Sequence, residues 1–184
     1  MTTAETRDPA ALEPYLDMFP SWLRTLGEDA GALGGVVTAD GSDEVKRYVT
    51  SGLNYIFKSL DLIPDGIDDL GFCDDAFVIR VAASLAVEAE PAAADGIVGR
   101  LAADAKSVEE FLGDDYPRLV EYVKALRKGA ARGRTVEDIM TDASIRTSFV
   151  HEVSAWSKEY QVPSFTRDVK TLIKLKAFLN AKLA

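Results

Sequence analysis

Six aspartates within a segment of fifteen residues are the part of this sequence whose residue types could do chemistry. They alternate with apolar residues in the segment 61–75, DLIPDGIDDLGFCDD, and are Asp61, Asp65, Asp68, Asp69, Asp74 and Asp75. Clustered carboxylates supply the oxygen ligands that hard divalent cations prefer. The same carboxylates repel one another at neutral pH unless they cap helices, meet cations or point apart into water. The segment therefore has two interpretations, a divalent-metal site and a set of helix caps.

The metal interpretation can be tested against the spacing of the aspartates. A calcium-binding loop that begins at Asp61 fails, because Ile63 and Phe72 occupy its third and twelfth positions. A magnesium site stays open, although the spacing fixes no geometry for it. Its candidate ligands, which would also serve a metal-dependent hydrolase, are Asp61, Asp65, Asp74 and Asp75.

The structural interpretation, which we favour, assigns each motif residue a role in a rigid helical hairpin. Proline disfavours helical geometry in the residue before it, so Pro64 ends the preceding helix near Asp61. Gly71 permits a left-handed or tight backbone. Carboxylates are stabilised by about 0.3–1 kcal/mol each at a helix N-terminus. The acids expected to cap are Asp65, at a short turn, and Asp74 and Asp75, at the start of a helix over 76–89.

The stretch from Tyr55 to Leu85 resembles the YkvA-like domain, a bacterial family of unknown function. The resemblance rests on two elements, Asp61-Leu-Ile-Pro-Asp65 and Gly71-Phe-Cys-Asp-Asp75, whose matching residues are Asp61, Pro64, Asp65, Gly71, Asp74 and Asp75. Asp68 departs from the pattern, because the family commonly has a second proline there. The resemblance implies a helical hairpin, which we place within residues 45–89, and implies no established activity. Many relatives are small and carry an apolar hairpin that is often interpreted as membrane-associated.

The remaining reactive side chains are few. A single cysteine, Cys73, excludes an internal disulfide and indicates a reduced compartment. Neighbouring carboxylates are expected to raise the pKa of its thiol and suppress the nucleophilic thiolate. A single histidine, His151, excludes the usual zinc ligand sets and is expected at the surface. No glycine-rich loop follows a strand, so we expect no bound cofactor.

Charge limits the classes of partner. A net charge of −9 argues against nucleic acid, because phosphate binding needs clustered Lys and Arg. Residues 1–117 carry 8 basic and 23 acidic side chains, whereas residues 118–184 carry 13 and 7. Such polarity favours a protein partner or self-association, or it holds the two halves together. The N-terminus has acids where a signal peptide needs a basic stretch and an apolar core, so we expect a cytoplasmic protein.

The elements that must position these residues are helices, because apolar residues recur at spacings of three and four along nearly the whole chain. We predict one all-α domain over 1–184, with about seven to eight helices. Asp8 and Pro9 begin the first helix, which Pro20 interrupts or kinks. Five glycines make residues 27–41 a flexible connection. Ser42 caps the next helix, in which Gly52 lets another helix approach closely.

Two further segments complete the prediction. Thr135 and Asp138 form a capping box for a helix near the basic, glycine-containing segment 128–134. Residues 166–184 form a basic amphipathic helix. Such a helix can lie on an anionic membrane, but a packed apolar stripe under a solvated charged face is the commoner outcome. The longest strongly apolar segment, 76–87, is interrupted by Arg80 and is shorter than the roughly 20 residues of a membrane-spanning helix.

The absence of a catalytic dyad or cofactor loop leaves a non-enzymatic interaction or structural module as the expected function. The two alternatives are the metal-dependent hydrolase that uses the aspartate cluster and a membrane-surface protein that docks through residues 166–184. The largest aromatic residues are expected in the core or at its rim rather than in a ligand cage: Tyr15, Trp22, Trp156 and Tyr160.

Overall fold

The computed structural model describes residues 8–184 except 60, 65 and 68, and it is helical almost throughout. This confirms the all-α class. The α-helices are Pro9–Leu12 (α1), Tyr15–Thr38 (α2), Asp43–Ile56 (α3), Cys73–Ala89 (α4), Ile97–Leu112 (α5), Tyr116–Ala125 (α6), Val136–Thr141 (α7), Ala143–Glu159 (α8) and Val169–Leu183 (α9). Short 3-10 helices cover Pro91–Ala94 (η2), Gly113–Asp115 (η3) and Leu126–Lys128 (η4). A two-residue hairpin pairs Ala130–Ala131 (β1) with Arg134–Thr135 (β2).

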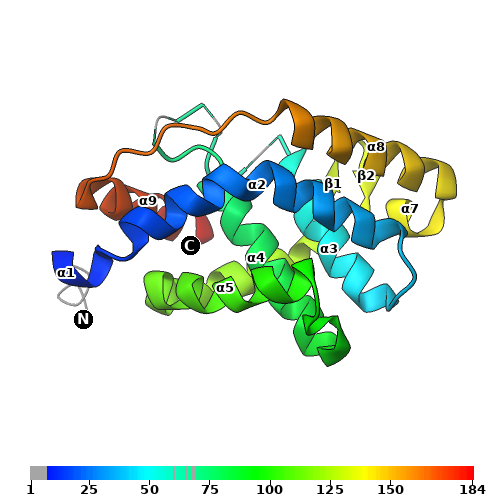
Figure 1. Cartoon of the computed structure of the whole chain (residues 1–184), viewed down its shortest axis with the longest axis horizontal. Helices are drawn as coiled ribbons and strands as arrows, with labels where there is room; N and C mark the ends of the chain where they lie inside the picture. The colour runs from blue at the N-terminus through cyan, green and yellow to red at the C-terminus, as the bar shows by residue number, and fades with distance from the viewer. Residues whose placement is uncertain (1–7, 60, 65, 68) are drawn as a thin grey trace.

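Helix α4 lies at the centre of the molecule. Its residues from Cys73 to Ala83 are all buried, as expected for a helix that is apolar on every side. It packs against α3 and α5, while the long helix α2 crosses it and packs against α8 (Figure 1). Helix α9 packs beside the N-terminal part of α2, and it buries Leu172, Leu175 and Leu179. The hairpin before α4 is therefore anchored in the core.

Several predicted helix ends are confirmed. The Asp8 carboxylate accepts a hydrogen bond from the Ala10 amide at the start of α1 (3.0 Å). Thr135 and Asp138 form the predicted capping box at α7. Ser42 lies at the N-cap of α3, but its side chain makes no capping hydrogen bond with the described amides. The acidic first turn of α3 supplies the negative charge that this end of a helix favours.

The predicted flexible connection over 27–41 is wrong, because α2 continues without a break as far as Thr38. Pro20 also lies within α2 and does not interrupt it. The connection to α3 is confined to residues 39–42. The glycines of α2 serve a different purpose, which is the close approach of α8.

Three glycines form a contact face on α2. A Cβ atom on Gly27 would lie 3.0 Å from the carbonyl oxygen of Ser157, and one on Gly31 would lie 2.8 Å from the Ser157 hydroxyl. A Cβ atom on Gly34 would lie 3.3 Å from a methyl group of Val153. The Ser157 hydroxyl donates a hydrogen bond to the Gly27 carbonyl oxygen (2.6 Å). A larger residue at these positions would push α8 away from α2.

Gly52 has the close-packing role that its place in a helix predicted. A Cβ atom there would lie 3.2 Å from the Ala82 methyl group and 3.5 Å from the Ile79 backbone. The absent side chain therefore lets α3 and α4 approach each other closely. This contact sets the distance between α3 and α4. The aspartate-rich segment connects these two helices, so the contact also sets the separation that the segment spans.

Candidate functional site

Asp74, in the first turn of α4, is fully buried and lies at the centre of a hydrogen-bond network. Its Oδ2 atom accepts a hydrogen bond from the Tyr55 hydroxyl (2.5 Å) and another from the Ile63 amide (3.2 Å). The Tyr55 oxygen in turn accepts a hydrogen bond from the Leu62 amide (2.8 Å). We call these four residues the Tyr55–Asp74 network. It joins the end of α3, the turn after it and the start of α4.

The predicted capping role of Asp74 and Asp75 is wrong in detail. Helix α4 begins at Cys73, two or three residues earlier than a cap at Asp74 or Asp75 requires, and its N-cap position is Phe72. Both acids lie inside the first turn and are buried, so they still face the positive end of the helix dipole. Left-handed backbone occurs at Asp69 (φ 67°) and Phe72 (φ 65°), on either side of the predicted Gly71.

The other two described acids of the segment, Asp61 and Asp69, are less buried than this pair. Asp61 is half-buried at the turn, while Asp65 and Asp68 lie outside the described residues. Asp69 accepts two hydrogen bonds from Thr166, one from its amide and one from its hydroxyl (both 2.9 Å). Within the described part of the chain, no group of three or more His, Cys, Asp or Glu side chains is placed to hold a metal ion.

Burial keeps the phenols and the thiol of this region protonated. It raises the pKa of Tyr55, and the charges of Asp74 and Asp75 raise it further. Burial and the nearby Asp61 and Asp74 raise the pKa of Tyr122 to about 12. The pKa of the Cys73 thiol is also raised, chiefly by burial and then by the neighbouring carboxylates. These groups are poor nucleophiles at neutral pH, because the nucleophilic form is the deprotonated one.

A second buried polar cluster, which the sequence analysis did not predict, surrounds Arg80 in α4. Its guanidinium lies 3.1 Å from an Asp104 oxygen and 3.8 Å from an Asp29 oxygen, and it stacks 4.1 Å above the Trp22 ring. It also donates a hydrogen bond to the Ala76 carbonyl oxygen (3.0 Å). Burial lowers the pKa of Arg80 to about 10, so it remains charged at neutral pH. The available signal was a charge inside an apolar helix, which requires a buried partner.

An open hollow lies on the surface beside the hairpin, and we call it the aromatic hollow. Its volume is about 520 Å³. The walls come from the start of α4, the end of α8 and the chain that follows α8: Phe72, Trp156, Glu159, Tyr160, Gln161, Val162 and Pro163. The Trp156 and Tyr160 rings lie 5.1 Å apart, and Phe72 meets the Tyr160 ring edge-on at 5.4 Å. These aromatics lie at the rim of the core, as predicted for Trp156 and Tyr160.

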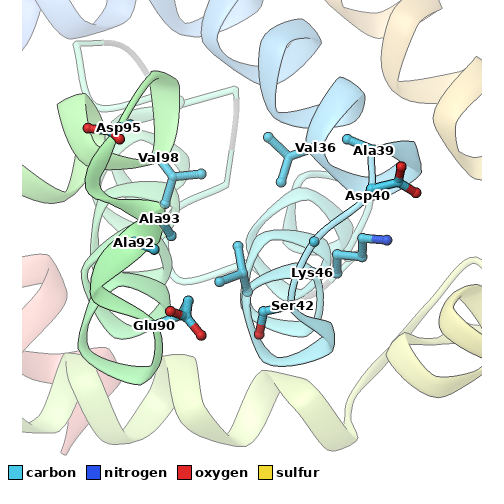
Figure 2. Close-up of a pocket in the computed structure, with 12 residues that line it drawn as sticks. Val36, Ala39, Asp40, Ser42, Lys46, Glu90, Ala92, Ala93, Asp95 and Val98 are labelled. Atoms are coloured by element: carbon cyan, nitrogen blue, oxygen red, sulfur yellow. The ribbon is translucent and has the colours of Figure 1, made fainter.

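A second hollow, which we call the tip groove, separates the α2–α3 turn from the α4–α5 turn (Figure 2). Its volume is about 420 Å³. The sequence indicated Ser42 only as a helix cap and residues 27–41 only as a connection, so it did not point to this groove. The groove is formed by short turns that come together only in the folded chain, so no local motif marks it.

The remaining sequence candidates lie away from both hollows. His151 is exposed on α8. The apolar stripe of α9 is packed inside the molecule, which agrees with the favoured interpretation of residues 166–184. Lys176 lies over the Phe111 ring at 5.4 Å. The described helices include none that is both long enough and apolar enough to span a membrane.

Comparison of the chain with models of protein families, with curated proteins and with solved structures found no match. The similarity of residues 55–85 to the YkvA-like domain therefore remains an expectation from its motif residues. The arguments about function that follow start from the geometry of the aromatic hollow and the Tyr55–Asp74 network.

Proposed function

We propose that this protein is a non-enzymatic, all-α interaction module that binds an extended segment of a partner protein at the aromatic hollow. The observation that carries the proposal is the hollow itself, in which one aromatic ring from the start of α4 and two from the end of α8 surround an open space of about 520 Å³. Aromatic side chains that are partly exposed provide large contact areas at low entropic cost, and they are enriched at interfaces.

Backbone strain at Phe72 supports a role for its ring. A residue with a Cβ atom pays about 1–2 kcal/mol for left-handed backbone geometry, and Phe72 has a φ of 65°. Such conformations persist where the surroundings require them, and they cluster at functional sites. At Phe72 this geometry accompanies the packing of the ring against Trp156 and Tyr160.

The chain beside the hollow offers an unpaired edge to the partner. Residues 161–165, which we call the strap, connect α8 toward α9 without regular secondary structure (Figure 1). The strap makes no backbone–backbone hydrogen bond with any described residue. Val162 is 52% exposed. An extended peptide can add to such an edge through main-chain hydrogen bonds, while one of its apolar side chains enters the neighbouring hollow.

The aspartate-rich hairpin then acts as a structural support for this surface. The Tyr55–Asp74 network fixes the turn before α4, and Phe72 lies two residues before Asp74. Asp69 holds the chain just after the strap through its two hydrogen bonds from Thr166. We further propose that residues 55–85 belong to the YkvA-like family of bacteria and that the protein acts in the cytoplasm, which the motif residues and the single buried cysteine support.

A peptide selection tests the proposal. A displayed library of random extended peptides is selected on the wild-type chain, with a Trp156→Ala variant used to remove peptides that bind elsewhere. Trp22→Phe leaves Trp156 as the sole tryptophan, so its fluorescence reports occupancy of the hollow. We expect enriched peptides with an apolar or proline centre, at least tenfold weaker binding to Trp156→Ala, and shifted amide resonances at 161, 162, 164 and 165.

Two outcomes would contradict the proposal. Selected peptides that bind Trp156→Ala as tightly as wild type would show that the hollow is not their site. A concentration-dependent dimer that dissociates on Val162→Glu would show that a second copy of the chain occupies this surface instead. Glu28→Gln, an exposed substitution on α2, is the matched control for nonspecific effects.

A further inference from the structure

The tip groove has the size and lining of a small-molecule site, and it is separate from the aromatic hollow. Ligand pockets occupy about 300–1,000 Å³ and combine apolar walls with a few polar groups, and this groove measures about 420 Å³. Its apolar walls are supplied by three helices and one 3-10 helix: Val36 from α2, Val45 from α3, Ala93 from η2 and Val98 from α5. Figure 2 shows Val36 and Val98 pointing toward each other across the space.

The polar groups of the groove lie at its edge. Glu90 and Ser42 lie on opposite sides of the lower mouth, and Asp40, Asp95 and Lys46 point outward from the rim (Figure 2). None of these four charged side chains forms an ion pair or a hydrogen bond with a described residue. Three of them are acidic and one is basic, so the rim has a net negative charge at neutral pH.

The backbone adds to this field at one side of the mouth. Glu90 is the C-cap of α4, and the last carbonyl groups of a helix give its C-terminus a partial negative charge. A cation near Glu90 would therefore meet a carboxylate and the negative end of a helix together. Three carboxylates against one ammonium group give the rim a net negative field, which concentrates cations.

We propose that the tip groove binds a small organic amine, with its apolar body between Val36, Val45 and Val98 and its ammonium group at Glu90. The apolar walls select the body, and the unpaired carboxylate selects the charge. This site is independent of partner binding at the aromatic hollow, because the two surfaces share no lining residue.

Three probes of equal shape test the charge preference: cyclohexylmethylamine, cyclohexylmethanol and cyclohexanecarboxylate. Each is titrated into the full chain and followed by amide resonances at residues 36–46 and 90–98. We expect saturable shifts in both segments with the amine, weaker binding of the alcohol and weakest binding of the carboxylate. Added salt should weaken the binding of the amine and bring its affinity closer to that of the alcohol.

Two charge variants with opposite expected effects sharpen the test. Glu90→Gln should weaken binding of the amine about twofold to fivefold, the range of an exposed ion pair. Lys46→Gln should strengthen amine binding by a similar factor, because Lys46 is the only basic residue among the described residues that line the groove. Glu28→Gln, outside the groove, should change nothing.

The proposal is overturned if no probe saturates at the groove, if the carboxylate binds as tightly as the amine, or if the two variants shift affinity in the same direction. Binding of peptides at the aromatic hollow should be equal in wild type and Glu90→Gln. Failure of the amine site would therefore leave the interaction proposal standing, and the reverse also holds.

Discussion

At the scale of single residues, Asp74 shows how a carboxylate from an acidic motif becomes part of a protein core. Burial removes the water that would solvate it, and that loss is costly unless donors replace the water. Here the donors come from Tyr55 in α3 and from the Ile63 amide in the following turn. The result is a polar contact that fixes three consecutive segments relative to one another.

Alkaline pH should reveal the environment of these tyrosines. The pKa of Tyr122 is about 12 in the folded protein and that of Tyr55 is also raised, against about 10 in an unfolded chain. Between these pKa values the folded state binds more protons than the unfolded state, so the free energy of unfolding falls as pH rises. Urea unfolding should show stability that is constant below about pH 9 and declines above about pH 10.

Phenylalanine variants give this prediction its control. Tyr122→Phe should remove part of the fall in the free energy of unfolding above pH 10. In an absorbance titration of the folded variant, the phenol that ionises near pH 12 should be missing. Stability that rises between pH 10 and 12, or tyrosines that all titrate near pH 10, would contradict the buried placement of these phenols.

Arg80 leads to a prediction of destabilisation. Arg80→Met removes the buried guanidinium from Asp104 and from Asp29. Asp104 is partly exposed, and Asp29 keeps its contacts with Arg100 (2.5 Å) and Thr25 (2.9 Å). Breaking a fully buried ion pair at one partner costs about 3–5 kcal/mol, and the exposure of Asp104 and the Arg100 contact of Asp29 make the loss here smaller than that.

Arg24→Met is the control, because Arg24 is exposed on α2 and forms no ion pair with a described residue. Its stability should stay within about 0.5 kcal/mol of wild type. Equal stability of the two variants in urea unfolding would contradict the role assigned to Arg80.

At the scale of elements, helical periodicity predicted the class of the fold and most helix positions, because each amphipathic helix records its buried face in its own sequence. The segment 27–38 was wrongly predicted as a connection, because glycines are typical both of flexible segments and of close contacts between helices. The contact partner of Gly27 is Ser157, far along the chain. Only the packing of α8 distinguishes the two uses.

For the candidate site, too, the sequence predicted where residues lie along a helix but not which residues they contact. The sequence placed Asp74 and Asp75 at the beginning of a helix, and that placement is correct to within one turn. The hydrogen-bond partners of Asp74 could not be predicted, because they depend on the direction in which the preceding helix presents Tyr55. The two hollows were also unpredictable, since their walls come from elements that meet only in the tertiary structure.

Two glycines on α2 form a matched pair that tests the helix contact. Gly27→Ala places a methyl group 3.0 Å from the Ser157 carbonyl oxygen and the Tyr160 ring, whereas the same change at Gly35 meets no atom within 4 Å. Overpacking costs about 1–3 kcal/mol, and alanine gains about 1 kcal/mol of helix propensity. Gly27→Ala should therefore destabilise the protein or leave it near neutral, while Gly35→Ala should stabilise it by up to about 1 kcal/mol.

Thermal and urea unfolding of the two variants measure this difference. Similar stabilisation by both alanines would show that α8 does not approach α2 at Gly27. Similar destabilisation by both would show that residues 27–38 need the conformational freedom of glycine, as a flexible connection would.

At the scale of the whole molecule, the uneven charge of the sequence is used partly within the chain. Arg167 pairs with Asp17 and Glu13, near the start of α2. Two further ion pairs join the acidic and the basic parts of the chain, Arg127–Glu44 and Arg47–Glu137. These pairs are partly exposed, so each contributes little and salt weakens it. Part of the charge polarity is therefore neutralised within the fold, and the rim of the tip groove keeps an uncompensated negative charge.

The central claim is that the aspartate-rich hairpin supports the fold, and that binding takes place on surfaces beside it. A metal ligand and a structural carboxylate respond differently to removal. In metal-free protein, loss of one of several repelling ligands is neutral or stabilising, whereas loss of a buried acceptor leaves its donors unsatisfied. Asp74 distinguishes the two cases, because its Oδ2 atom accepts hydrogen bonds from the Tyr55 hydroxyl and from the Ile63 amide.

The most direct measurement is urea unfolding of wild type, Asp74→Asn and Asp74→Ala in chelator, repeated with millimolar magnesium. We predict that Asp74→Ala loses about 2–4 kcal/mol, because the Tyr55 hydroxyl and the Ile63 amide lose their acceptor. Asp74→Asn keeps an acceptor oxygen and should lose less, and magnesium should not stabilise wild type beyond the effect of ionic strength. An Asp74→Ala variant as stable as wild type in chelator, together with stabilisation of wild type by magnesium, would contradict the account.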